Sequence, residues 1–242
     1  MKRPITVSCI PVVVLLLSTV IRAQQNPLAR PPFLPANEWM TVPVPWLPAN
    51  DPTPAATRQQ RDQYFDALIG LPSPLTPVTA KGTGFSDGAY LGRQPEIPDI
   101  PNRTIVVATF SAYRSVLSKS GRAVYTEVQF STTNVFQDAS VNLHAGDSLD
   151  LVIPGGTVQI QTGAVLSFLT QPRQYSVQPG KTYLLIISFH SNGGFYMLGK
   201  SWDLSTGTVQ PNFVAGTQIS STLLGLTVQQ LVAKLNTEFG IP

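Results

Sequence analysis

The sequence predicts a mainly β fold, an antiparallel barrel or sandwich of about six to seven strands, with one helix before it and one C-terminal helix. Three observations lead to this prediction. Between residues 104 and 210, short β-branched and aromatic runs alternate with turn residues. Apolar residues at helical spacing occur on the two flanks of this region, not within it. The order therefore lacks the strand–helix alternation that is typical of a parallel sheet.

The first 23 residues resemble a secretory signal peptide. Lys2 and Arg3 form a positive start, an apolar run extends from Ile10 to Ile21, and Ala23 precedes a plausible cleavage point. The apolar run is shorter than the roughly 20 residues that span a bilayer. We therefore expect a secreted or periplasmic protein with no transmembrane span after cleavage. A retained membrane anchor is the alternative.

Export would change both the charge and the cysteine content. Three of the 16 Lys and Arg residues lie in the signal, which leaves 13 against 13 Asp and Glu. A neutral chain without a Lys/Arg run is not expected to bind nucleic acid. The single cysteine, Cys9, also lies in the signal. The mature chain would then have no disulfide, thiol nucleophile or cysteine–metal site, and we predict no cofactor and no metal.

A proline-rich arm is predicted over residues 24–52. Prolines alternate there with apolar residues such as Trp39 and Trp46, so a helix or a central strand is disfavoured. We expect the arm to be extended and to pack its aromatic side chains on the folded domain. The alternative is a polyproline segment that binds an envelope or extracellular partner.

A helix is predicted over residues 53–70. Thr53 can cap it, Pro54 suits its first turn, and Gly70 ends it. One apolar face is expected, formed by Tyr64, Phe65, Leu68 and Ile69. The charged residues are expected on a solvated face: Arg58, Arg61, Asp62 and Asp66. A Pro/Gly-rich loop is predicted over residues 71–103.

The barrel domain is predicted over residues 104–210. A long hairpin runs from 105 to 136, and Glu127 alternates with Val128, so we expect Glu127 to face solvent. A turn is predicted at Gly155-Gly156. Residues 184–187 are predicted to form a strand buried on both faces, and residues 191–194 are predicted to form a hairpin turn. A linker and a helix with apolar residues at i, i+3, i+4 and i+7 complete the chain at 211–242.

One catalytic pattern is present. Residues 84–88 match G-x-S-x-G, with Ser86 as the candidate nucleophile and Asp147 and His190 as candidate acid and base. The mechanism needs a buried strand before the serine and a helix after it. Neither flank of Ser86 has that character, so a surface loop is favoured and a serine hydrolase is the alternative.

The other candidate sites are weaker. His144 and His190 lie 46 residues apart, so they form no helix-face metal pair. The aspartates at 138, 147 and 150 do not follow calcium-loop spacing. Several aromatic residues on or near predicted strands could form the core or line a sugar- or lipid-binding face: Tyr113, Tyr125, Tyr175, Tyr183, Phe195, Tyr196 and Trp202.

Five short segments carry a family resemblance: Val124–Phe130, Gly146-Asp147, Pro154–Gly156, Gln178–Leu185 and Gly194–Tyr196. Their order is similar to that of uncharacterised secreted bacterial proteins with T-E-V, G-G and G-x-x-Y-L-L motifs. It is also similar to netrin-like modules, which include tissue inhibitors of metalloproteinases and fold as OB-type barrels. The resemblance covers residues 104–210 and implies an OB-like barrel outside the cytoplasm. Those inhibitors present an N-terminal cysteine to the protease metal, which the mature chain would lack.

Taken together, the residues predict an exported, non-catalytic binding or structural module of the cell envelope. Two alternatives are left open. One is a secreted serine hydrolase that uses Ser86, and the other is a sugar- or lipid-binding barrel.

Overall fold

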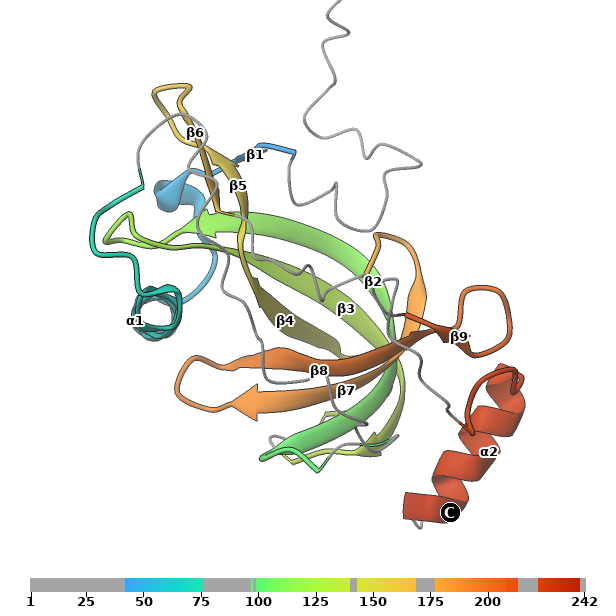
Figure 1. Ribbon diagram of the computed structural model, residues 1–242. Helices are drawn as coiled ribbons and strands as arrows, with labels where there is room; N and C mark the ends of the chain where they lie inside the picture. The colour runs from blue at the N-terminus through green and yellow to red at the C-terminus, as the bar shows by residue number, and fades with distance from the viewer. Residues whose placement is uncertain are drawn as a thin grey trace, which may run out of the picture.

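A computed structural model describes residues 42–75, 97, 99–139, 143–168, 177–212 and 222–239 (Figure 1). The predicted signal, the arm up to residue 41 and most of the predicted loop at 71–103 lie outside the described residues. Within the described part, the fold is mainly β with two helices, as the sequence predicts. No described helix combines the length and the apolar character that a bilayer crossing requires.

The main sheet has six strands in the order β4-β3-β2-β7-β8-β9. Their bounds are β2 Arg103–Leu117, β3 Val124–Gln137, β4 Ser148–Pro154, β7 Thr182–His190, β8 Phe195–Asp203 and β9 Gln210–Pro211. Neighbours in this order pair antiparallel. A parallel contact between Leu151 of β4 and Tyr196 of β8 joins the two sides and closes five strands into a barrel.

The barrel interior is filled by one face of each strand. Val106, Phe110, Val128 and Leu185 belong to this core, and each is buried. The predicted double burial of residues 184–187 is confirmed. Leu185 and Ile187 face the interior, while Leu184 and Ile186 pack in a separate core beneath the C-terminal helix.

A second, three-stranded sheet stands beside the barrel in the order β1-β5-β6. It contains β1 (Val44–Pro45), β5 (Gly156–Gln159) and β6 (Val165–Phe168). The arm contributes β1, which pairs parallel with β5, and a short 3-10 turn, η2, follows at Pro48–Asn50. Trp46 is buried between the sheet and the barrel, as expected for an arm that packs its aromatics.

The Gly155-Gly156 turn is confirmed, but it is a corner and not a hairpin. Both glycines have positive φ angles, 100° and 140°. β4 and β5 on either side of them do not pair with each other, because β5 belongs to the second sheet. The chain therefore leaves the barrel wall at this point.

Two helices lie on opposite sides of the barrel (Figure 1). Helix α1 spans Ala55–Ile69 and ends at Gly70, whose φ of 65° is the left-handed C-cap that glycine favours. Its predicted apolar face is confirmed, with Phe65 fully buried. The predicted Thr53 cap is wrong, because the N-cap is Pro54 and no described side chain caps the helix.

Helix α2 spans Val228–Phe239. Thr227 and Gln230 form a reciprocal capping box, in which each backbone N–H is bonded by the other's side chain. Leu231 and Leu235 are buried in a core that also contains residues of β2, β3, β7 and β8. The predicted C-terminal helix and its apolar stripe are confirmed.

Candidate functional site

The inner face of α1 is charged as well as apolar. Arg58, Arg61, Asp62 and Phe65 follow one another at i, i+3, i+4 and i+7, so they share one side of the helix. Arg61 is only 3% exposed, and Asp62 is buried. The predicted solvated face is therefore wrong for these two residues. Phe65 packs against the barrel. Arg61 and Asp62 lie one turn before it on the same side of the helix, so they are buried in the same interface.

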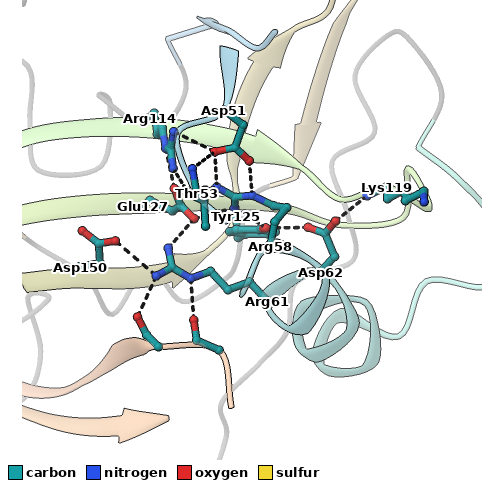
Figure 2. Close-up of polar contacts among 12 residues, drawn as sticks. Asp51, Thr53, Arg58, Arg61, Asp62, Arg114, Lys119, Tyr125, Glu127 and Asp150 are labelled. Carbon is teal, nitrogen blue, oxygen red and sulfur yellow. Dashed lines mark hydrogen bonds and ion pairs between the residues drawn. The ribbon is translucent and has the colours of Figure 1, made fainter. Parts of the chain in front are cut away.

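The two arginines of this helix face form ion pairs with Glu127 of β3. Strand alternation directs it away from the barrel interior, as predicted, but α1 covers that face and leaves Glu127 only 5% exposed. The prediction that it faces solvent is wrong for this reason. Its Oε1 accepts hydrogen bonds from Arg58 Nη1 at 2.6 Å and Arg61 Nη1 at 2.7 Å. Its Oε2 accepts from Arg114 Nε at 2.5 Å and Arg58 Nη2 at 3.2 Å (Figure 2).

We name this group the arginine cluster. Its members are three arginines and three carboxylates from the arm, α1 and three barrel strands: Asp51, Arg58, Arg61, Arg114, Glu127 and Asp150.

The arginine cluster holds the end of the arm through Asp51. Arg58 Nε donates to Asp51 Oδ2 at 2.5 Å, and Arg114 Nη1 lies 3.2 Å from Asp51 Oδ1. Thr53 Oγ1 accepts from both arginines, at 2.8 and 2.6 Å. The hydroxyl that the sequence suggested as a helix cap is instead used to bind guanidinium groups.

Arg61 extends the cluster to the β7–β8 turn, next to β4. Its Nε donates to the carbonyl of Gly193 at 2.9 Å and its Nη2 to that of Gly194 at 2.8 Å, both in the β7–β8 turn. Nη2 also lies 3.3 Å from Asp150 Oδ2 on β4. One side chain thus ties α1 to strands β3 and β4 and to the β7–β8 turn (Figure 2).

Asp62 of α1, which is not a member of the arginine cluster, contacts the β2–β3 turn and β3. Asp62 accepts from Tyr125 Oη at 2.6 Å and from the backbone N–H of Lys119 at 3.0 Å. Burial raises the pKa of Asp62. Burial also raises the pKa of Tyr125, so the phenol keeps its proton and donates a hydrogen bond to Asp62.

Ionisation of the other two buried carboxylates is favoured. Burial alone would raise the pKa of Glu127, but the hydrogen bonds and positive charges of Arg58, Arg61 and Arg114 outweigh it and lower the pKa. Burial likewise opposes ionisation of Asp51, yet bonds from Arg58 and Thr53 lower its pKa to about 2. Both groups are therefore charged in the folded protein at neutral pH.

The lowered pKa of Asp51 predicts that the stability of the fold depends on pH in the acid range. Because the folded pKa of Asp51 lies below its ordinary value of 3.8, its contribution is complete above that value and is lost as the pH falls towards 2. We expect Asp51→Asn to flatten the fall in unfolding free energy between pH 4 and pH 2, measured by urea denaturation. Asp99→Asn, at a fully exposed side chain, is the control. Parallel curves for wild type and Asp51→Asn would contradict the assignment.

A pocket of about 420 Å³ opens beside the arginine cluster. It lies between the start of α1 and the outer faces of β2, β3 and β4, and its polar lining includes Thr57, Arg61, Arg114, Glu127, Gln129 and Asp150. This volume falls in the range of small-molecule sites. Arg114 is 29% exposed and Asp150 is 42% exposed, so both a cation and an anion remain accessible.

The candidate hydrolase residues are not brought together by any contact that the structure describes. Ser86 lies outside the described residues. Asp147 accepts a bond from the backbone of its neighbour His144, which is exposed. His190 stacks on Phe195 and contacts Tyr64 edge-on, and burial lowers its pKa. The hydrolase hypothesis stays a prediction.

Most of the aromatic residues considered for sugar or lipid binding are core residues. Five of them are buried: Tyr125, Tyr183, Phe195, Tyr196 and Trp202. Tyr113 is partly buried, and Tyr175 lies outside the described residues. Within the described ranges, no group of three or more His, Cys, Asp or Glu side chains could hold a metal ion.

Comparison with known proteins does not assign the chain. No family model matches it, and no curated protein of similar sequence is found. The site must therefore be interpreted from its own geometry. One signal in the sequence pointed to it, namely that Arg58, Arg61 and Asp62 continue the stripe of Phe65 by one turn. The partner Glu127 carried no such signal, because alternation along β3 does not reveal what covers its outer face.

Proposed function

We propose that this chain is an exported, non-catalytic binding module whose ligand occupies the pocket beside the arginine cluster. The observation that carries the proposal is the pocket itself, which sets accessible polar groups on a rigid framework of strands and one helix. Export is supported by the charged and apolar start of the chain. An envelope or extracellular partner that binds the arm is part of the same proposal.

An OB-type barrel is part of this proposal. Five strands close in the order β2-β3-β4-β8-β7, with β4 and β8 parallel, and OB-type barrels are five-stranded. The ligand-binding faces of such barrels lie on the outside of the sheet. The pocket lies on the outer faces of β2, β3 and β4.

A binding role is favoured over catalysis by the state of Glu127, the buried carboxylate of the pocket. Glu127 accepts four hydrogen bonds from three arginines, and these arginines lower its pKa. A carboxylate with no free acceptor site and a lowered pKa is a poor general base. The arginine cluster therefore supplies a fixed framework and not a proton relay.

The test fills the pocket without disturbing the cluster. Gln129 is exposed and lines the pocket, so Gln129→Trp should occlude it. Ser131 is exposed on the same face of β3, outside the pocket lining, so Ser131→Trp is the matched control. Amino acids, di- and tripeptides, mono- and disaccharides and phosphatidylglycerol vesicles are screened by ligand-observed NMR.

We expect at least one probe to bind wild type and Ser131→Trp and to lose binding in Gln129→Trp. If every probe behaves identically with all three proteins, the proposal is wrong.

A further inference from the structure

We propose that the ligand is a short peptide with a free amino terminus and a free carboxyl terminus. This inference rests on the proposed function, because it names the ligand class of the same pocket. It follows from which groups of the arginine cluster still have hydrogen-bonding capacity, how far apart those groups are, and the sign of the charge at each.

The negative end of the pocket is Asp150. Its one contact within the cluster is the 3.3 Å approach of Arg61, and 42% of its side chain is exposed. Ionised carboxylates accept about four hydrogen bonds, so Asp150 retains capacity for a ligand ammonium group. Glu127, which also lines the pocket, has already accepted four bonds from three arginines. The acceptor that a ligand meets is therefore Asp150.

The positive end is Arg114. Guanidinium carries five N–H donors. Arg114 donates two of them, to Glu127 and Thr53, and its Nη1 lies 3.2 Å from Asp51 Oδ1. Even if Nη1 directs one N–H to Asp51, each terminal nitrogen retains at least one N–H, which matches the two oxygens of a carboxylate. The first turn of α1 also lines the pocket and contains no acidic residue. Its partial positive charge adds to that of Arg114.

The sheet register sets the spacing of the two ends. Arg114 is paired with Glu127 across β2 and β3, and Gln129 is paired with Asp150 across β3 and β4. Arg114 and Asp150 thus share one face of the sheet, two strands apart and offset by two residues. Strand spacing and rise place their backbones about 12 Å apart. An extended chain covers roughly 3.5 Å per residue, so two to four residues match this span.

Other ligand classes match the pocket less well. A purely anionic ligand would meet Asp150, whose accessible charge is negative. A saccharide site commonly offers an aromatic face, but the aromatic residue of this pocket, Tyr113, packs its ring edge-on against Phe110 of the barrel core. Opposite charges at opposite ends instead select a molecule with one charge at each end.

The experiment measures the affinity of Ala-Ala-Ala and of its N-acetylated and C-amidated forms by titration calorimetry. We expect blocking of either terminus to weaken binding at least tenfold. Asp150→Asn should weaken the free tripeptide at least tenfold and leave the affinity of the N-acetylated form unchanged. Thermal melts check that Asp150→Asn is folded, which its exposure favours.

The outcomes separate this inference from the proposed function. If blocked and free tripeptides bind equally, or if a saccharide binds in a Gln129→Trp-sensitive manner and the tripeptide does not, the peptide inference is wrong and the binding module stands. If the tripeptide binds Gln129→Trp and wild type equally, peptide recognition by this pocket is excluded.

Discussion

Glu127→Ala should lower the free energy of unfolding by about 3–5 kcal/mol, the range for breaking a buried ion pair by removing one partner. Three guanidinium groups share this carboxylate, and Arg61 lies almost wholly out of solvent. Without Glu127, the buried charge of Arg61 keeps its two carbonyl partners and the long contact to Asp150. Urea denaturation at pH 7 measures the change.

The loss should begin at α1. Arg58, Arg61 and Asp62 attach this helix to the barrel beside the apolar contact of Phe65. Amide hydrogen exchange in Glu127→Ala is therefore expected to rise in α1 and the arm and to stay unchanged in α2, which packs on another core. Glu238→Gln, on the exposed side of α2, is the control substitution. A change below about 1 kcal/mol, typical of exposed ion pairs, would show that the cluster does not hold the helix.

Gly156→Ala should be strongly destabilising, although it adds only one methyl group. A Cβ at this position would collide with Thr126 Oγ1 and lie 2.8 Å from Ser115 Oγ. The φ of 140° is also one that residues with a side chain rarely adopt. The added methyl group introduces backbone strain of about 1–3 kcal/mol and overpacking of about 1–3 kcal/mol. Both are present in the folded variant, so we expect the two losses of unfolding free energy to add.

A second glycine separates the two effects. Gly163 has a φ of 81° and open space around its Cβ position, so Gly163→Ala introduces strain without a collision. In thermal unfolding, we expect both variants to be destabilised and Gly156→Ala to lose more. Equal losses would show that the corner where β4 leaves the barrel has room for a side chain, contrary to the packing of Ser115 and Thr126.

The elements of the fold could be predicted from local pattern because local forces decide them. Runs such as 184–187 have no polar residue to face water, so double burial follows from composition. Thr227 and the stripe of α2 specify a helix that begins and packs as expected. The sequence predicts a turn at Gly155-Gly156. It does not predict that the chain leaves the barrel there, because that depends on which sheet the next strand joins.

The arginine cluster could be predicted only in part. Spacing along α1 places Arg58, Arg61 and Asp62 beside Phe65, so their burial was implied by a stripe that the sequence displays. The sequence by itself determined a mainly β chain with two flanking helices. Tertiary structure alone decided that Glu127, on the outward face of β3, is buried. Strand alternation fixes the side to which a residue points, whereas its exposure depends on the element that docks there, here a helix 58 to 72 residues earlier in the chain.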